Sequence, residues 1–256
     1  MKWSEATVVS QRHLGGPNYQ LALREPALAA SARPGQFIEL SSCGATLLNK
    51  PVSIAGSDRK AGTFTIVYKV VGPGTRAFSG YAQGRQVKLL GPCGTGFSPV
   101  TGAALVVGGG IGIPPLHFLV EANPDAQFTV LLGARTKAEL VLEHGLAQRC
   151  ATPPSVATDD GSRGHKGVVT DLLETALGCA AAPVFACGPV PMLVRVANLC
   201  AAAKVPCTVC LEAYMGCGMG VCMGCVIPTV RGMERVCREG PVFNAADVDW
   251  PALLKE

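Results

Sequence analysis

The sequence predicts three successive units: an N-terminal antiparallel β-barrel, a doubly wound parallel α/β domain and a small cysteine-rich C-terminal domain. Three observations predict this order. Short apolar runs separated by Gly and Pro turns fill the first hundred residues, strands then alternate with helices, and a Gly- and Cys-rich segment follows from about Cys207. We therefore expect domains over residues 1–100, 101–206 and 207–256.

The composition of the chain excludes several classes of protein. Of its 256 residues, 48% are apolar and 16% are charged, which suits a large core and excludes a disordered chain. The net charge of +4 comes without a dense basic run, so we expect no binding of nucleic acid. The first ten residues lack an apolar export signal, and the uncharged stretch 102–120 contains five glycines and a Pro-Pro pair. We expect a cytoplasmic protein without a membrane-spanning segment.

The first hundred residues contain six short segments that are typical of strands. Turn residues such as Pro34-Gly35 and Pro73-Gly74 separate them. Six such strands suit a small closed barrel. The segments are residues 6–9, 19–23, 37–40, 52–55, 64–71 and 86–90.

In the following hundred residues, short apolar runs typical of strands alternate with longer segments typical of helices. Strands are expected at 104–107, 128–132, 156–158 and 184–186, and helices at about 114–121, 137–148, 168–177 and 189–203. This alternation predicts a parallel, doubly wound sheet, which binds ligands at the carboxyl ends of its strands. Arg135 follows one such strand, where it could meet a 2′-phosphate, stack on an adenine or face solvent.

Residues 108–112, GGGIG, form a glycine-rich turn between a predicted buried strand and a helix. They do not match the GxGxxG fingerprint, because Ile113 stands where the third glycine would be. Bare backbone N–H groups at the start of a helix still favour an anion such as a pyrophosphate. A tight turn without a ligand is the alternative.

Four of the twelve cysteines follow the spacing of an iron–sulfur site. Cys217, Cys222, Cys225 and Cys237 are spaced C-x4-C-x2-C-x11-C, the plant-type pattern for a [2Fe–2S] cluster. The intervening glycines let the backbone fold around a cluster and direct N–H groups at its sulfurs. The segment has few apolar anchors, so a metal would stabilise it.

A structural zinc is the alternative. Cys207-x2-Cys210 and Cys222-x2-Cys225 are separated by eleven residues, as in a zinc ribbon. Residues 206–211 are typical of a strand, in which positions i and i+3 face opposite sides. We therefore expect that Cys207 and Cys210 do not converge on one metal.

The barrel carries polar residues that predict a phosphate-bearing cofactor. Lys50 and Ser53 enter one strand, Lys69 lies on the next, and Gly74 and Thr75 begin a short helix. On the cysteine loop, an apolar set predicts a docking surface for a partner or, alternatively, a shield between the cluster and water. This set is Met215, Met219, Val221 and Met223.

In its order of units and in these motifs the chain resembles the ferredoxin–NADP reductase superfamily, and within it the electron-transfer subunits of class B dihydroorotate dehydrogenase. The resemblance covers essentially the whole chain, and its most specific part runs from Leu211 through the four cysteines to Phe243. It implies FAD at an Arg-Pro-x-Ser motif, where this chain has Lys50 in place of the arginine. Lysine meets a phosphate as a point charge, whereas arginine grips it bidentately.

The resemblance implies the residues of three cofactor sites. FAD would be bound by Lys50, Pro51, Val52, Ser53, Val67, Tyr68, Lys69, Gly74 and Thr75. NAD(H) would be bound by Gly109, Gly110, Gly112, Cys187, Gly188 and Pro189. The [2Fe–2S] cluster would be held by Cys217, Cys222, Cys225 and Cys237.

The resemblance also implies an NAD-linked oxidoreductase component of pyrimidine biosynthesis. Electrons would pass from NADH through FAD and the cluster to the FMN of a dihydroorotate dehydrogenase catalytic subunit, in a heterotetramer with two copies of each subunit. No residue need act as a catalytic acid or base. Glu212 is a candidate for lining the nicotinamide site or, alternatively, a surface or capping carboxylate. The alternatives are a subunit of another NAD(P)H-linked oxidoreductase, of the sulfide dehydrogenase or ferredoxin reductase type, and a zinc-stabilised redox sensor or binding module.

Overall fold

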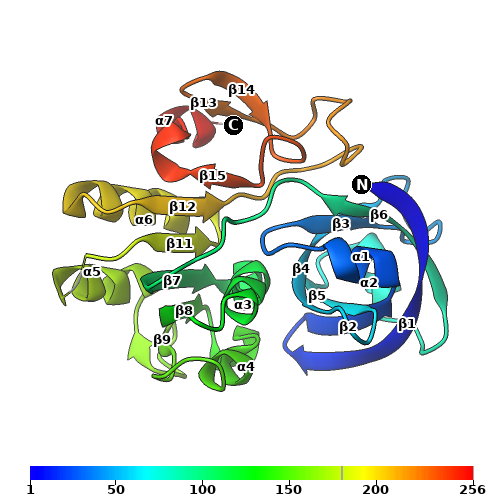
Figure 1. Ribbon diagram of the computed structural model, residues 1–256, viewed down its shortest axis with the longest axis horizontal. Coiled ribbons are helices and arrows are strands. Elements are labelled where there is room, and N and C mark those ends of the chain that lie inside the picture. The colour runs from blue at the N-terminus through cyan, green and yellow to red at the C-terminus, as the bar shows by residue number, and fades with distance from the viewer. Residues whose placement is uncertain (180, 256) are drawn as a thin grey trace.

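The computed structural model describes residues 1–179 and 181–255. A β-barrel lies beside a larger sheet with helices on both faces, and the C-terminal segment lies across the edge of that sheet (Figure 1). No helix within the described residues is long and apolar enough to cross a membrane.

The barrel closes in the strand order β1-β2-β5-β4-β3-β6, and all of its strand pairs are antiparallel. Its interior follows the period of two expected of strands: Leu21 and Leu23 of β2 are buried, as are Phe64 and Ile66 of β5. The six predicted strands are confirmed. Their bounds are β1 Lys2–Gly15, β2 Asn18–Arg24, β3 Phe37–Leu40, β4 Lys50–Asp58, β5 Thr63–Lys69 and β6 Gln86–Cys93, with the short helices α1 Pro26–Ser31 and α2 Pro73–Phe78 between them.

The second sheet has seven strands in the order β10-β9-β8-β7-β11-β12-β15, and it is parallel except where β15 pairs with β12. The predicted doubly wound sheet is therefore confirmed. Two of its strands come from the segment that the sequence assigns to the C-terminal domain. The bounds are β7 Ala103–Gly109, β8 Gln127–Ala134, β9 Ser155–Thr158, β10 His165–Lys166, β11 Val184–Cys187, β12 Cys207–Cys210 and β15 Val242–Asn244.

Successive residues of the central strands point alternately to the two faces of this sheet, and both faces are covered by helices. Leu105 and Val107 of β7 pack toward α5 and α6, whereas Ala104 and Val106 pack toward α3 and α4. A strand buried on both faces is apolar throughout, which is why this stretch resembles a membrane segment in composition. The helices are α3 Ile113–Ala122, α4 Glu143–Ala147, α5 Val169–Cys179 and α6 Val190–Ala203.

The helix expected over residues 137–148 is wrong in its extent. The chain forms a single 3-10 turn, η2 Lys137–Glu139, and then the short helix α4. Between them Leu140 is extended (φ −70°, ψ 118°) and Leu142 is left-handed (φ 59°). The break lets Val141 enter the core and brings the carbonyl of Ala138 against the β1–β2 turn, where a Cβ on Gly15 would lie 3.0 Å from it.

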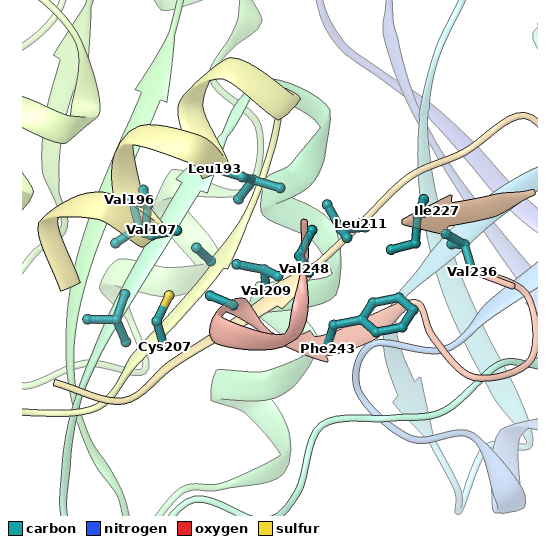
Figure 2. Close-up of a cluster of buried hydrophobic side chains, with 14 of the residues drawn as sticks. Val107, Leu193, Val196, Cys207, Val209, Leu211, Ile227, Val236, Phe243 and Val248 are labelled. Atoms are coloured by element: carbon teal, nitrogen blue, oxygen red, sulfur yellow. The ribbon is translucent and has the colours of Figure 1, made fainter. Parts of the chain in front are cut away.

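The C-terminal segment shares its core with the sheet. A hairpin of β13 Val226–Thr229 and β14 Gly232–Arg235 is followed by η3 Ala245–Asp247 and α7 Trp250–Leu253. Figure 2 shows Ile227, Val236 and Phe243 in one group with Val209 and Leu211. The segment therefore has more apolar anchors than the sequence suggests, because it buries them against its neighbours.

Helix α3 joins the sheet to the barrel. The His117 Nδ1–H donates to the carbonyl oxygen of Ala55 in β4 at 2.9 Å, and Phe118 is buried in the barrel core. Burial lowers the pKa of His117, although the Ala55 carbonyl and Glu121 oppose the shift. The neutral ring therefore belongs to the folded state.

We predict that His117→Leu destabilises the protein at about pH 8 by about 1–3 kcal/mol, because the buried Ala55 carbonyl loses its donor. Below the ordinary histidine pKa of 6.5, the unfolded wild type binds a proton that folded His117 resists, so wild-type stability falls with falling pH. The leucine variant has no titrating group at this position, so its stability does not fall in acid for this reason. Urea midpoints should therefore converge between about pH 8 and about pH 5.5, and a gap that widens in acid would contradict the assignment.

Candidate functional site

A cavity of about 800 Å³ lies at the carboxyl ends of the parallel strands. Its walls include the turns after β7 and β8, Asp159 after β9, and the start of α6. Asn18 and Lys69 close it from the barrel side. This is the edge at which doubly wound sheets bind ligands, and the volume is that of a small-molecule site.

The two turns predicted to bind a dinucleotide are in contact. A Cβ on Gly112 would lie 2.5 Å from the backbone of Cys187, and one on Gly109 would lie 3.1 Å from Cδ of Pro189. Gly109, Gly110 and Pro189 line the cavity. The other three predicted residues do not line the cavity: Gly112, Cys187 and Gly188. Gly112 and Cys187 instead contact each other, which holds the two turns together. Gly110 has φ +54° with open space beside it, so its backbone faces the cavity.

The residues predicted to bind a flavin gather where β4 begins and β5 ends. Val52 and Tyr68 point into the barrel core, whereas Val67 is packed on the opposite side with the residues of α3. The Tyr68 hydroxyl donates to Gln11 at 3.3 Å inside the barrel. Tyr68 therefore presents only its backbone to the outer face, which carries Ser53 and Lys69 by alternation.

The start of α2 completes this group. A Cβ on Gly74 would lie 2.6 Å from Cε of Lys50, so the lysine side chain crosses the helix at this point. The Thr75 hydroxyl accepts hydrogen bonds from the N–H groups of Val71 at 3.0 Å and Gly72 at 3.3 Å. The Thr75 side chain therefore stabilises the turn at the start of α2. The start of β4, the end of β5 and the start of α2, which carry the residues predicted to bind a flavin, thus lie together.

Sequence reasoning missed Glu139, which joins two units across the cavity. Lys69 Nζ lies 2.7 Å from Glu139 Oε2, and Arg135 Nε lies 3.5 Å from Oε1. The hydrogen bond from Lys69 lowers the pKa of Glu139. Arg135, considered for a 2′-phosphate, thus has an acidic partner. No local signal could have found Glu139, because it lies in the segment expected to be one helix.

Glu212 lines the same cavity with an exposed side chain, and its place beside a nicotinamide stays a prediction. The surrounding protein raises the pKa of its carboxyl by desolvation. It also acts electrostatically on Cys187, in the turn after β11. Glu212 therefore stands at the end of the cavity nearest the cysteine loop that follows β12.

The four cysteines of the predicted iron–sulfur site lie on one loop and one hairpin. Cys225 directly precedes β13, Cys237 follows β14, and pairing of the two strands brings them together. The backbone N–H groups of Met219 and Val221 donate to Cys217 Sγ at 3.4 Å each. The N–H of Cys237 donates to Cys225 Sγ at 3.4 Å.

The thiols fall into two interacting pairs, Cys217 with Cys222 and Cys225 with Cys237. Within the described ranges no three His, Cys, Asp or Glu side chains gather as ligands of one metal ion. Burial opposes ionisation of Cys217, but backbone N–H groups outweigh it and lower its pKa to about 6. Burial and the hydrogen bond with Cys225 raise the pKa of Cys237 to about 12. Two thiol pairs with N–H donors fit a cluster in which each of two irons takes two thiolates.

The zinc alternative fails on geometry. Cys207 packs on the face of α6 and interacts with Cys200. Cys210 lies on the opposite face and interacts with Cys187. Each is tied to a partner on its own side of the sheet, as expected of positions i and i+3 in a strand.

A buried carboxyl beneath the cysteine loop was also missed. Glu39 of β3 is 3% exposed, and its Oε1 is the one buried side-chain N or O atom in the described chain without a hydrogen-bond partner. Burial and the charge of Cys217 raise the pKa of Glu39 to about 7, while Lys50 opposes the shift. Glu39 therefore lies between the cysteine loop and the flavin motif. The sequence shows it only as a polar residue inside a strand.

Comparisons with known proteins place this arrangement in one family. Residues 212–249 match the iron–sulfur cluster binding domain of dihydroorotate dehydrogenase B. The electron transfer subunit of dihydroorotate dehydrogenase B (NAD+) from Geobacillus thermodenitrificans is 39% identical over 253 residues, covering 94% of this chain and 96% of the relative. The same subunit of Desulforamulus reducens is 38% identical over 251 residues, covering 93% and 95%.

Solved structures show the same architecture. A chain in the NADH-dependent reduced ferredoxin-NADP oxidoreductase structure, described for flavin-based electron bifurcation, superimposes with a TM-score of 0.89 at 29% identity. The match covers 98% of this chain and 91% of that chain. A mutant of ferredoxin-NADP+ reductase from Plasmodium falciparum has a TM-score of 0.63 at 13% identity, over 76% of this chain and 89% of that one, and shows the fold alone.

We predict that Gly218→Ala lowers the iron content of the purified protein. A Cβ on Gly218 would overlap Cγ of Glu39, and its φ of +66° costs a side chain roughly 1–2 kcal/mol. The loop that carries Cys217 would have to move. Gly102→Ala is the matched control, because Gly102 also has a positive φ (+72°), nothing lies within 4 Å of its Cβ position, and it lies outside the cysteine loop. Equal iron in both variants and the wild type, measured per polypeptide, would contradict the prediction.

Proposed function

The chain belongs to the family of electron-transfer subunits of dihydroorotate dehydrogenase B, and on that premise we propose that it passes electrons from NADH through FAD and a [2Fe–2S] cluster to the FMN of a partner catalytic subunit. One observation carries this proposal. The cysteine loop rests on barrel strand β3 at Glu39, and the charge of Lys50 in the flavin motif reaches the same carboxyl. The two proposed cofactor sites are therefore neighbours.

The proposed FAD site is the outer face of the barrel at β4, β5 and α2. Lys50 supplies a positive charge for the pyrophosphate, and the backbone at Gly74 and Thr75 can approach closely because Gly74 has no side chain. Ser53 and Lys69 offer side chains for the rest of the flavin, whereas Val67 is buried against α3 and supports this face from the core. Val52 and Tyr68 contribute backbone. The flavin, when bound, exchanges an electron pair with a nicotinamide and single electrons with an iron–sulfur cluster.

The proposed NAD site is the cavity at the strand ends. The bare backbone of Gly109 and Gly110, in the turn that leads from β7 into α3, suits a pyrophosphate. Lys69 belongs to the flavin motif and also lines this cavity, so the two sites are continuous. A nicotinamide placed near Glu212 would lie beside both the flavin face and the cysteine loop. The chain thereby orients the donor and supplies no acid or base.

The proposed cluster ligands are Cys217, Cys222, Cys225 and Cys237. Their hydrogen bonds from backbone N–H groups stabilise thiolates, which are the form that binds iron. The proposed partner is a dihydroorotate dehydrogenase catalytic subunit, in a complex with two copies of each chain. A ferredoxin-linked NAD(P) oxidoreductase is the second candidate, because the structural neighbour with TM-score 0.89 has that activity in its name.

We predict that Cys222→Ser removes the cluster and leaves the flavin. Cys222 lies on the exposed part of the loop, whereas the flavin residues belong to the barrel. Iron per polypeptide should fall to near zero while FAD per polypeptide is unchanged. NADH should still reduce an artificial acceptor at the flavin, but transfer to the catalytic subunit should fail. Cys179→Ser, an exposed cysteine on α5, is the control, and parallel loss of FAD and iron would contradict the separation of sites.

The structure narrows the expected docking surface. Val221 and Met223 are 74% and 49% exposed, whereas Met215 and Met219 pack against the core. The two exposed residues lie on the outer turn of the cysteine loop. An apolar surface beside a cluster suits a partner that must receive its electrons.

We predict that Met223→Glu weakens binding of the catalytic subunit by about tenfold or more, because a charge would be buried at the contact. Met233→Glu is the matched control, since Met233 is 51% exposed and lies on the β13–β14 hairpin. Iron and flavin contents should be unchanged in both variants. Dissociation constants from biolayer interferometry decide the outcome. Equal weakening in the two variants would remove the docking role of Met223.

A further inference from the structure

The side chain of Arg235, at the end of β14, reaches back to the cysteine loop. Its Nη1–H donates to the carbonyl oxygen of Gly220 at 2.7 Å. Its Nε–H donates to Glu239 Oε2 at 2.9 Å and its Nη2–H to Oε1 at 2.5 Å. Two parallel hydrogen bonds to one carboxylate fix both the plane and the direction of the guanidinium.

Gly220 is the point at which this contact closes the loop. It is buried between Cys217 and Cys222 in sequence and has φ +82°. A Cβ here would lie 2.7 Å from Cδ of Arg238, so a second arginine covers the other side of the residue. The N–H of Gly220 also interacts with Cys237. The loop is therefore held to the hairpin through one residue.

The Arg235 guanidinium also places a positive charge on the side of the cysteine group formed by Cys225 and Cys237. Arg235 and Glu239 are only 24% and 30% exposed. Arg235 pairs across the hairpin with Val226, the residue after Cys225, and lies two residues before Cys237, so the guanidinium belongs to the same end of the hairpin as these two cysteines. Glu39 faces Cys217 from the barrel side. In a half-buried place a charge is screened less than at the surface.

Arg231 on the same hairpin has similar ion pairs but a different role. Its Nη2 lies 2.9 Å from Glu234 and its Nη1 lies 2.6 Å from Asp247. It is 55% exposed, and its side-chain hydrogen bonds go to these two carboxylates. Arg231 therefore stabilises the hairpin, whereas Arg235 joins the hairpin to the loop.

We propose that Arg235, held by Glu239, is a positioning residue of the iron–sulfur site: it clamps the loop at Gly220 and places a fixed positive charge beside the Cys225–Cys237 pair, which raises the reduction potential of the cluster. The inference rests on the proposed cluster site. A reduced cluster carries one more negative charge than the oxidised one, so a nearby cation favours reduction. The clamp and the charge are separable, because they depend on different properties of the side chain.

The test uses the purified holoprotein with four substitutions. Arg235→Gln removes the charge and should lower the cluster midpoint potential in an EPR-monitored titration. It should also release iron to a chelator about tenfold faster or more, as outer-shell substitutions do. Arg235→Lys keeps the charge, so its midpoint should stay near that of the wild type while iron release still accelerates, because an ammonium cannot span Gly220 and Glu239 together. Glu239→Gln leaves the cation uncompensated and should raise the midpoint.

Arg231→Gln is the control and should change neither the midpoint nor iron release. If Arg235→Gln cannot be isolated with iron, the unchanged midpoint expected of Arg235→Lys and the raised midpoint expected of Glu239→Gln still decide the question. Unshifted midpoints in Arg235→Gln and Glu239→Gln, or an equal shift in Arg231→Gln, would overturn the role of Arg235. A wild type without the EPR signal of a reduced [2Fe–2S] cluster would overturn the proposed function as well, so the two failures are distinguishable.

Discussion

The cysteine-bearing segment has no core of its own, and this constraint determines where the candidate sites lie. Ile227, Val236 and Phe243 are buried against the sheet edge and the barrel. Each fully buried side chain of this kind contributes roughly 1.5–3 kcal/mol, so the segment cannot leave its place without a large loss. Strand β12 leads directly into the loop and β15 returns to pair with it. Packing within the chain thus sets the loop beside β3, which pairs with the start of β4, where the proposed flavin motif begins.

Charge is then distributed around the loop from three sides. Backbone N–H groups inside the loop favour ionised sulfur at Cys217. From the hairpin, Arg235 adds a cation near Cys225 and Cys237, and from the barrel Glu39 adds an acid near Cys217. A group of thiolates in one small volume repels itself, so donors and a cation nearby are what make it stable enough to form. The packing described above is what delivers these charges from separate units.

The sequence predicts the barrel and the parallel sheet well because both depend on local patterns. Alternation and Gly-Pro turns mark the six barrel strands, and apolar runs between helices mark the sheet. The cysteines are found by spacing alone. Residues 137–148 were mispredicted because a long-range contact between Ala138 and the β1–β2 turn overrides local helix preference. Strand β15 joins the sheet for the same reason, since the whole cysteine loop and the β13–β14 hairpin separate it in sequence from its partner β12.

The residues that sequence reasoning missed lie where units meet. Glu139 bridges the sheet domain to Lys69 of the barrel, and Glu39 lies between the barrel and the cysteine loop. Neither belongs to a motif, because each is defined by a neighbour from another unit. Burying the Glu39 carboxyl without a partner for Oε1 costs stability, and its raised pKa is the same cost expressed as proton affinity. Local and global preferences disagree at few places in a natural chain, and those places tend to be functional. Here the unfavourable residue, Glu39, lies between the two proposed redox sites. In an electron-transfer subunit the residues at this place are constrained by the cofactors on either side as well as by stability.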